Sequence, residues 1–420
     1  MTEPVSIVLI GLGGYGSVYL AALLDQRADE RIRVAGGIDP EPDRCERLAE
    51  LRRQNVPIFR SPEAFFDTGR ADLAVISSPL QHHAAQTCLA LAHGSHVLCE
   101  KPAAPTVQEL DRMIRARDEA RRFVAIGYQW SFSDTIRQLK AAIRAGRFGE
   151  PRRAKTLCLW PRTERYYHRN DWAGRRQDEH GHWVLDSPVN NAMAHFLHNL
   201  LYLLGDTGNT SARPVDVTAE TCRANPIDNF DTAAIRVHTD AGVEILFCGS
   251  HAIREDFGPI FSLEFTRGHI EYAGGQAAIT ARFDDGSVEH YAPPDSEPQT
   301  RKLWTCVQAV RDGTTIPCGL EAARSLTLCT NGAQDSAPDP AAFPRDLVRV
   351  TGEPPDRLTW VHGLANTLQH CYAENALPRE LDVAWANSGR PIDLRDYRYF
   401  PGGRPRQSAE GPSSHEEEST

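Results

Sequence analysis

The chain has 420 residues and a formal net charge of −10, with 41% hydrophobic and 24% charged residues. Such a length exceeds one ordinary core, so two domains are expected, and the composition excludes a fibrous or wholly disordered chain. The acidic balance, without a Lys/Arg cluster beside aromatic residues, argues against a nucleic-acid partner.

Targeting signals and cysteine usage predict a cytoplasmic protein. The N-terminal residues lead directly into a strand pattern, without the basic and apolar regions of a signal peptide. No apolar run approaches the roughly 18 residues that a membrane span needs, so no membrane partner is expected. The 10 cysteines are scattered singly and form no CxxC pair. We therefore expect reduced thiols, with neither disulfides nor a metal site.

A glycine-rich turn separates the first strand pattern, residues 6–10, from a helical pattern over residues 18–24. Its first glycine permits a tight turn, the second lets the backbone approach a pyrophosphate, and the third allows close helix packing. The order strand, GxGxxG, helix predicts a dinucleotide site, formed by Gly11, Leu12, Gly13, Gly14, Tyr15 and Gly16.

A second strand, residues 32–38, ends at Asp39. A carboxylate at this point accepts hydrogen bonds from the adenosine ribose hydroxyls and repels a 2′-phosphate, so NAD is favoured over NADP. Arg44 lies close enough to keep NADP as the less favoured option. The alternative is that Asp39 only caps the turn before Pro40.

Strand and helix patterns continue to alternate as far as Gly127, which predicts a doubly wound parallel sheet. The further strands are expected at residues 71–77, 97–99 and 123–127, with helices at 83–93 and 107–122.

The strand at 97–99 stops abruptly at Glu100, Lys101 and Pro102. Proline cannot donate to a neighbouring strand, so Lys101 should lie at the carboxyl end of a strand, where open α/β sheets bind ligands. A partly desolvated lysine beside a carboxylate can exchange protons near neutral pH. The alternative is a surface salt bridge at a turn.

Beyond residue 152 the alternation gives way to runs of strand patterns with one solvated or ligand-facing side. Between them, residues 165–172 combine aromatic, guanidinium and amide groups that suit a polyol or sugar, although a solvated loop is the alternative. Residues 186–204 predict a helix with Asn191, His195 and Asn199 one turn apart and His198 beside them. Strands are expected at 153–160, 215–222, 232–238, 243–248, 261–266 and 279–283, helices at 303–312, 320–335 and 360–374, and a Pro-rich connector at 338–356.

These motifs, in this order, resemble the Gfo/Idh/MocA oxidoreductase family: GxGxxG, the strand-end Asp39, Pro79 with His83, Gly94-Ser95-His96-Val97 leading into Glu100-Lys101-Pro102, and Gly127-Tyr128-Gln129. The resemblance implies an NAD(P)-binding Rossmann domain over 1–128. It also implies an α/β domain with a mostly antiparallel open sheet over 129–400, for substrate and oligomerisation, including an extra arm at 338–400. A disordered tail at 401–420 and a homodimer or homotetramer are expected.

The resemblance also implies the site residues. Lys101, His195 and Asn191 are the expected catalytic group, with Asn191 where the family has an Asp and His198 where an Asp is common. Ser131 stands where many members have an Arg. Cofactor contacts are expected from the glycine turn and from Asp39, Ser78, Pro79, His83, Glu100, Lys101 and Gln129, and substrate contacts from Tyr128, Tyr166, Arg169, Trp172, His195 and His198.

The resulting hypothesis is an oxidoreductase that moves a hydride between NAD and a secondary alcohol of a sugar, polyol or sugar derivative. Lys101 is the expected base, with Glu100 holding or tuning it. Two alternatives stay open. One is a lyase or glycosidase that uses NAD for transient oxidation, and the other is a non-catalytic sensor that binds dinucleotide and sugar.

Overall fold

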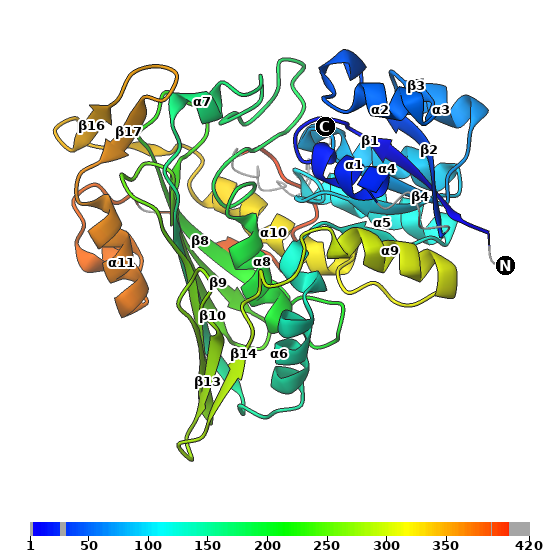
Figure 1. Cartoon of the computed structure of the whole chain (residues 1–420). Coiled ribbons are helices and arrows are strands. Elements are labelled where there is room, and N and C mark those ends of the chain that lie inside the picture. The colour runs from blue at the N-terminus through cyan, green and yellow to red at the C-terminus, as the bar shows by residue number, and fades with distance from the viewer. Residues whose placement is uncertain (1–2, 26–30, 388, 403–420) are drawn as a thin grey trace, which may run out of the picture.

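The computed structural model describes residues 3–25, 31–387 and 389–402. In these ranges the chain forms two large β-sheets with helices packed between and around them, and a small hairpin at one end (Figure 1). The predicted disordered tail lies outside the described residues from position 403 onward.

The first sheet is parallel throughout its described strands and has the order β3-β2-β1-β4-β5-β6. Its central strands β1 and β4 are buried along their whole length because helices cover both faces. The strand order reverses between β1 and β4, which opens a crevice at their carboxyl ends. The strands are β1 (Val5–Ile10), β2 (Ile32–Ile38), β3 (Ile58–Phe59), β4 (Leu73–Ile76), β5 (His96–Cys99) and β6 (Val124–Ile126).

Five α-helices of the described chain accompany this sheet, and together they confirm the predicted doubly wound architecture. Sequence analysis missed α2, β3 and α3, which span only 6, 2 and 7 residues and carry little periodic signal. The helices are α1 (Gly16–Asp25), α2 (Leu48–Arg53), α3 (Pro62–Thr68), α4 (His83–Ala92) and α5 (Val107–Ala120).

The second sheet is mixed and mostly antiparallel, as predicted, with the order β14-β13-β12-β11-β7-β10-β9-β8-β15 and β18 beside β8. Only the pairs β7–β10 and β8–β15 are parallel among its described strands. The strands are β7 (Pro151–Leu159), β8 (Pro214–Arg223), β9 (Thr232–Thr239), β10 (Glu244–Ser250), β11 (Phe257–Phe265), β12 (Gly268–Tyr272), β13 (Ile279–Phe283), β14 (Val288–Tyr291), β15 (Ala341–Ala342) and β18 (Ile392–Asp393).

Helices on the inner face of the second sheet join it to the first one (Figure 1). Asn331 of α10 accepts a hydrogen bond from the backbone N–H of Val107 at 2.9 Å and donates to the Pro105 carbonyl at 2.8 Å. Arg324 pairs with Asp111 of α5 at 2.9 Å. These polar contacts fix α10 against the N-terminal sheet. The inner helices are α6 (Asp134–Arg144), α8 (Ala194–Leu203) and α10 (Leu320–Ser336), whereas α9 (Arg301–Asp312) packs against β1, β4 and β5 of the first sheet.

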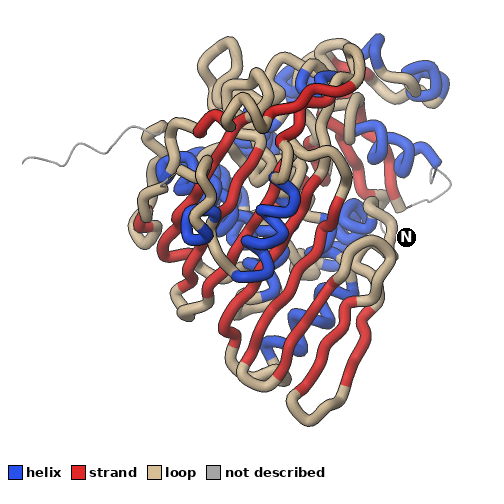
Figure 2. The backbone as a smooth tube through the Cα atoms, turned by 90° about the vertical axis from the view of Figure 1, so that its left-hand side faces the viewer, coloured by secondary structure: helices blue, strands red, loops and turns tan. Residues whose placement is uncertain are grey.

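A second, smaller apolar cluster lies on the outer face of the large sheet. There α11 (Leu364–Glu374) packs Leu364, Leu368 and Cys371 over β7 and β10, beside the hairpin of β16 (Val348–Thr351) and β17 (Leu358–Val361). Figure 2, which looks onto this face, shows a helix lying over the strands. The expected dimer or tetramer relied on an exposed sheet face, and α11 covers part of that face.

Three predicted elements differ from the structure. The Pro-rich connector contains β15 and β16, and the helix expected from residue 360 begins only at Leu364, after β17 and the left-handed Gly363. The helix expected over 186–204 begins only at Ala194. Before it, the Asn190 side chain donates to the backbone carbonyls of residues 184 and 185, and such side-chain hydrogen bonds favour turns over helix.

No helix in the described ranges combines the length and the apolar character needed to cross a membrane.

Packing of α11 on the sheet should contribute measurably to stability. Replacing the fully buried Leu368 by Ala leaves a cavity, and we expect the free energy of unfolding to fall by about 2–5 kcal/mol. Chemical denaturation followed by circular dichroism measures this change. Val350→Ala, at a side chain 58% exposed on β16, is the control and should change stability by less than about 0.5 kcal/mol. Equal effects of the two substitutions would contradict the packing described.

Candidate active site

A cleft of about 730 Å³ lies between the carboxyl ends of the parallel strands and the second sheet's loops. The glycine turn, Asp39, Glu100 and Lys101 line one side of it. Tyr166, Arg169 and Trp172 line the other side, together with Asn191. The cleft therefore brings together residues that the sequence places more than 150 positions apart.

The glycine turn between β1 and α1 leaves space where a dinucleotide phosphate would lie. Gly11 has a φ of +91°, and a Cβ there would come within 2.8 Å of the Ser77 carbonyl carbon. A Cβ at Gly16 would lie 2.1 Å from the Gly11 carbonyl oxygen. At Gly13, by contrast, a Cβ would meet nothing within 4 Å. The first and last glycines thus form the turn, and the middle one leaves open room for a pyrophosphate.

Asp39 lies at the end of β2, where it lines the cleft. One carboxylate oxygen accepts the backbone N–H of Leu12 and the other that of Glu41, both at 2.9 Å. Each oxygen keeps a second lone pair for a ribose hydroxyl. Arg44 pairs with Glu41 at 2.6 Å, so it does not neutralise Asp39. The arrangement suits NAD, since a 2′-phosphate would meet the Asp39 carboxylate.

Ser78, Pro79 and His83 form the floor of the cleft after β4. The buried His83 ring bridges two loops, because its nitrogens lie 2.8 Å from the Pro102 carbonyl and 3.0 Å from the Ser78 carbonyl. This ring therefore fixes the loop that carries Lys101 relative to the end of β4.

Lys101 extends from the end of β5 into the cleft. Its Nζ donates hydrogen bonds to the backbone carbonyl of Asn191 at 2.9 Å and to the Asn191 side-chain Oδ1 at 3.0 Å. Burial lowers the pKa of Lys101 to about 8, and Glu100 opposes this shift. A lysine with this pKa can both give and take a proton near neutral pH.

Glu100 does not form the expected pair with the Lys101 side chain. Its carboxylate instead accepts hydrogen bonds from Tyr19 and from Lys302 of α9, each at 2.5 Å. Lys302 is 1% exposed and also donates to the Gly127 carbonyl. Burial alone would raise the pKa of Glu100, but Lys302 holds it below its ordinary value. Sequence analysis missed Lys302 because it lies 202 positions from Glu100 and carries no local motif.

A buried carboxylate that sequence analysis did not select, Asp186, lies next to this group. Asn191 Nδ2 donates to Asp186 Oδ1 at 2.7 Å, and the Gly174 backbone N–H donates to Asp186 Oδ2 at 2.6 Å. The predicted helix concealed this contact, because residues five apart on a helix would not meet so directly. In the turn that the chain forms instead, the two side chains touch.

The aromatic wall of the cleft comes from α7 (Glu164–Tyr167) and the loop after it. The Arg169 guanidinium lies 3.6 Å from the Tyr166 ring centroid and 5.1 Å from that of Trp172. Here the three side chains predicted to contact substrate lie together, as a cation stacked on two aromatic faces.

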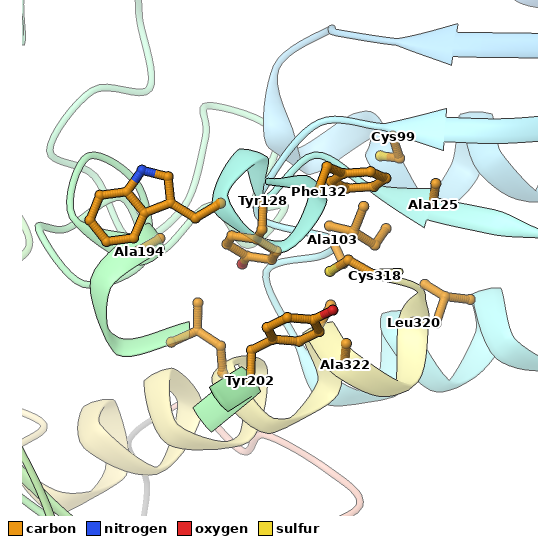
Figure 3. Packing of buried hydrophobic residues seen from close by; sticks show 14 of the residues in the cluster. Cys99, Ala103, Ala125, Tyr128, Phe132, Ala194, Tyr202, Cys318, Leu320 and Ala322 are labelled. Atoms are coloured by element: carbon orange, nitrogen blue, oxygen red, sulfur yellow. The ribbon is translucent and has the colours of Figure 1, made fainter. Parts of the chain in front are cut away.

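Other predicted contacts lie away from the cleft surface. Tyr128 stacks on His198 at 3.8 Å between ring centroids, and Ser131 Oγ lies 3.0 Å from His198 Nε2, so both rings are buried behind the cleft. Figure 3 shows Tyr128 packed among buried side chains near Phe132 and Tyr202. Gln129 bonds to Asp295 at 3.1 Å in a separate hollow. Tyr128, Gln129 and His198 therefore do not line the cleft.

His195, on α8, lies beside that buried layer and is not among the residues that line the cleft. Its ring is edge-on to Tyr128, with 5.9 Å between centroids. Burial, and then Lys101, lower the pKa of His195 well below its ordinary value. The imidazole is therefore neutral, and it can donate one hydrogen bond and accept another without adding charge.

A doubly wound sheet with an open glycine turn and a carboxylate at the end of the second strand is typical of dinucleotide-binding proteins. Comparison with known families agrees. The description "Oxidoreductase family, NAD-binding Rossmann fold" matches residues 5–128, and "GFO/IDH/MocA C-terminal domain" matches residues 136–271. The chain belongs to the Gfo/Idh/MocA oxidoreductase family, and its N-terminal domain binds NAD. Both the resemblance and the predicted cofactor are thereby confirmed.

Individual relatives share about a quarter or less of their aligned residues with this chain. Inositol 2-dehydrogenase of Burkholderia ambifaria (strain MC40-6) is 26% identical over 201 residues, which are 48% of this chain and 54% of the relative. D-glucoside 3-dehydrogenase of Escherichia coli (strain K12) is 26% identical over 149 residues, 36% and 42% of the two chains. The chain thus spans about half or less of these relatives. The WlbA dehydrogenase from Bordetella pertussis, solved with NADH and UDP-GlcNAcA, shares the fold at a TM-score of 0.64 and 20% identity, over 79% of this chain and 97% of that one.

Two glycines of the turn provide a matched pair for testing the cofactor site. Gly16→Ala forces a methyl against the Gly11 carbonyl, so we expect a stability loss of about 1–3 kcal/mol together with weaker NADH binding. Gly13→Ala should leave the unfolding temperature unchanged and still weaken NADH binding, because its methyl enters the phosphate space. Thermal unfolding and NADH fluorescence titration measure both effects. Unchanged NADH affinity in Gly13→Ala would contradict this placement of the phosphates.

Proposed function

We propose that this protein is an NAD-dependent oxidoreductase that transfers a hydride between the nicotinamide and a secondary alcohol carbon of a sugar, polyol or sugar derivative. The observation that carries the proposal is the position of Lys101. Its Nζ lies in the cleft between the NAD-binding turn and the aromatic wall, with a pKa of about 8. Membership of an oxidoreductase family supports the same reaction class.

Loss of hydride from a carbinol carbon requires removal of the hydroxyl proton, and Lys101 can take it as a neutral amine. When bound, NAD supplies the hydride acceptor, or in its reduced form the donor. Two oxygens of Asn191 accept hydrogen bonds from Nζ. The lone pair of the neutral amine then stays available for the substrate hydroxyl. We assign His195, as a neutral imidazole, the role of orienting that hydroxyl or sharing its proton.

The wall of the cleft opposite the glycine turn supports the proposed substrate class. Tyr166 and Trp172 line this wall of the cleft, and Arg169, stacked on them, offers N–H donors for the oxygens of a sugar or polyol. The names of the relatives, inositol and glucoside dehydrogenases, support a polyhydroxylated substrate. Asp39 favours NAD over NADP, and Arg44 pairs with Glu41 instead of with Asp39.

A panel of sugars and inositols, screened with NAD and NADP in parallel, tests the proposal. We expect net NADH formation with at least one polyol and a preference for NAD. Substrate conversion without net NADH would instead indicate a lyase or glycosidase with transient oxidation. Binding of NAD and sugar without conversion under any condition would indicate a sensor, and either result would overturn the proposed dehydrogenase.

Removal of the Lys101 amine should abolish chemistry and spare cofactor binding. We expect Lys101→Met to lower kcat by about 10²–10⁴-fold, as loss of a general base does, with an NADH dissociation constant within a factor of about three of wild type. Lys155→Met is the control, since Lys155 lies on β7 near Tyr372 of α11 on the outer face. Wild-type turnover in Lys101→Met would rule out this lysine as the base.

The pH dependence should follow the lysine. Because burial lowers the pKa of Lys101 to about 8, alcohol oxidation should accelerate as pH rises through about 8 and then level off as the amine becomes neutral. The reverse reduction needs the ammonium, so its rate should fall over the same interval. Initial rates measured in both directions from pH 6 to 10 test this. A pH-independent oxidation rate would contradict it.

A further inference from the structure

Asp186 is a carboxylate held almost entirely within the protein. Its side chain is 3% exposed, and hydrogen bonds from the Gly174 backbone and the Asn191 side chain reach its two oxygens. The Arg169 guanidinium lies 3.8 Å away, and Asn229 donates to the Asp186 backbone carbonyl. Burying an unpaired carboxylate costs free energy, and these donors offset that cost for Asp186.

The contacts of Asn191 connect this carboxylate to the lysine. An asparagine amide has one accepting end, Oδ1, and one donating end, Nδ2. Burial raises the pKa of Asp186, whereas Arg169 and the hydrogen bonds from Gly174 and Asn191 favour its ionised form. As a carboxylate it only accepts, so it takes the Nδ2 end and leaves Oδ1 directed at the Lys101 ammonium. With the two ends exchanged, the amide would present N–H groups to the ammonium and an oxygen to the carboxylate. Asp186 therefore determines which face of Asn191 the lysine meets.

We propose that Asp186 is the positioning residue of the site: through Asn191 it holds Lys101 Nζ in the cleft, and its negative charge stabilises the lysine's ammonium form. The inference rests on the proposed function. It assigns to Asp186 the negative charge that Asn191, standing where the family has an Asp, cannot carry. Asp186 does not line the cleft, so it acts on the lysine and does not touch the substrate.

The balance of charge around Lys101 shows why Asp186 matters. Lys302 and Arg169 disfavour the ammonium, and the neutral His195 does not stabilise it. Glu100 favours it, but its carboxylate is already engaged by Lys302. Asp186 is the remaining described carboxylate that favours the ammonium, and Arg169 compensates it only at 3.8 Å. The groups facing Lys101 are thus Glu100 on its own loop, Lys302 on α9, Arg169 and Asp186 on the segment before α8, and His195 on α8.

The lysine itself can report on Asp186 without any substrate. The chain contains only Lys101, Lys140, Lys155 and Lys302, so ¹³Cε-lysine labelling gives a simple NMR spectrum in which Lys101→Met identifies the Lys101 signal. In Asp186→Asn we expect the Lys101 titration midpoint to fall on the order of one pH unit, because an attractive charge is removed. The low-pH limb of polyol oxidation should move to lower pH by the same amount.

Two further variants separate positioning from general damage. Asp228→Asn is the control, because Asp228 is an exposed carboxylate that likewise accepts a backbone N–H, from Arg176, and it should leave the Lys101 midpoint unchanged. The exchange Asp186→Asn with Asn191→Asp keeps one acid and one amide and puts the acid against the lysine. We expect its Lys101 midpoint to rise above that of wild type.

An unchanged Lys101 midpoint in folded Asp186→Asn would overturn the proposal. If Asp186→Asn does not fold, the exchange variant decides, and a midpoint no higher than wild type overturns it. Failure of the proposed function would look different, because wild type would then transfer no hydride to NAD with any polyol while the lysine titration still responded to Asp186.

Discussion

The buried ion pair between Glu100 and Lys302 is the interaction on which the site depends. Glu100 and Lys101 are adjacent in one loop and carry opposite charges. Without other partners, their side chains could form a salt bridge with each other. Lys302 comes from α9, late in the chain, and takes the Glu100 carboxylate into the interior together with Tyr19. Lys101 is thereby left to point the other way, into the cleft. The same contact joins α9 to the loop after β5, two segments that lie far apart in the sequence. Removing one partner of such a buried pair typically costs about 3–5 kcal/mol.

The surroundings of Lys101 lower its pKa, so that it gives up its proton more readily than an exposed lysine. Burial and the neighbouring cations Lys302 and Arg169 oppose the ammonium, whereas Glu100 and Asp186 favour it, and the resulting pKa of about 8 is close to physiological pH. A neutral His195 adds a hydrogen-bonding group without adding charge. Acid–base catalysis is most effective when the pKa lies near the working pH, so the surroundings match the proposed role of Lys101.

Local sequence patterns were sufficient to predict most of this fold and the NAD site. The strand, GxGxxG, helix order and the strand-end Asp39 depend on residues close together in the chain, and the structure forms them as expected. The lysine's partners were not predictable in this way. Lys302 is distant in sequence, and Asp186 reaches Asn191 only because residues 186–193 turn instead of forming a helix. Tyr128 and His198 are polar aromatic residues near the site in sequence, but mutual stacking buries them behind it.

Transfer of deuterium tests the central claim most directly. The protein would be incubated with NAD and a polyol deuterated at its carbinol carbons, and the nicotinamide C4 examined by NMR. The account predicts that deuterium appears at C4 in stoichiometric amounts and on one face only, because the cleft holds the substrate on one side of the cofactor. Product formed without any deuterium reaching C4 would contradict it.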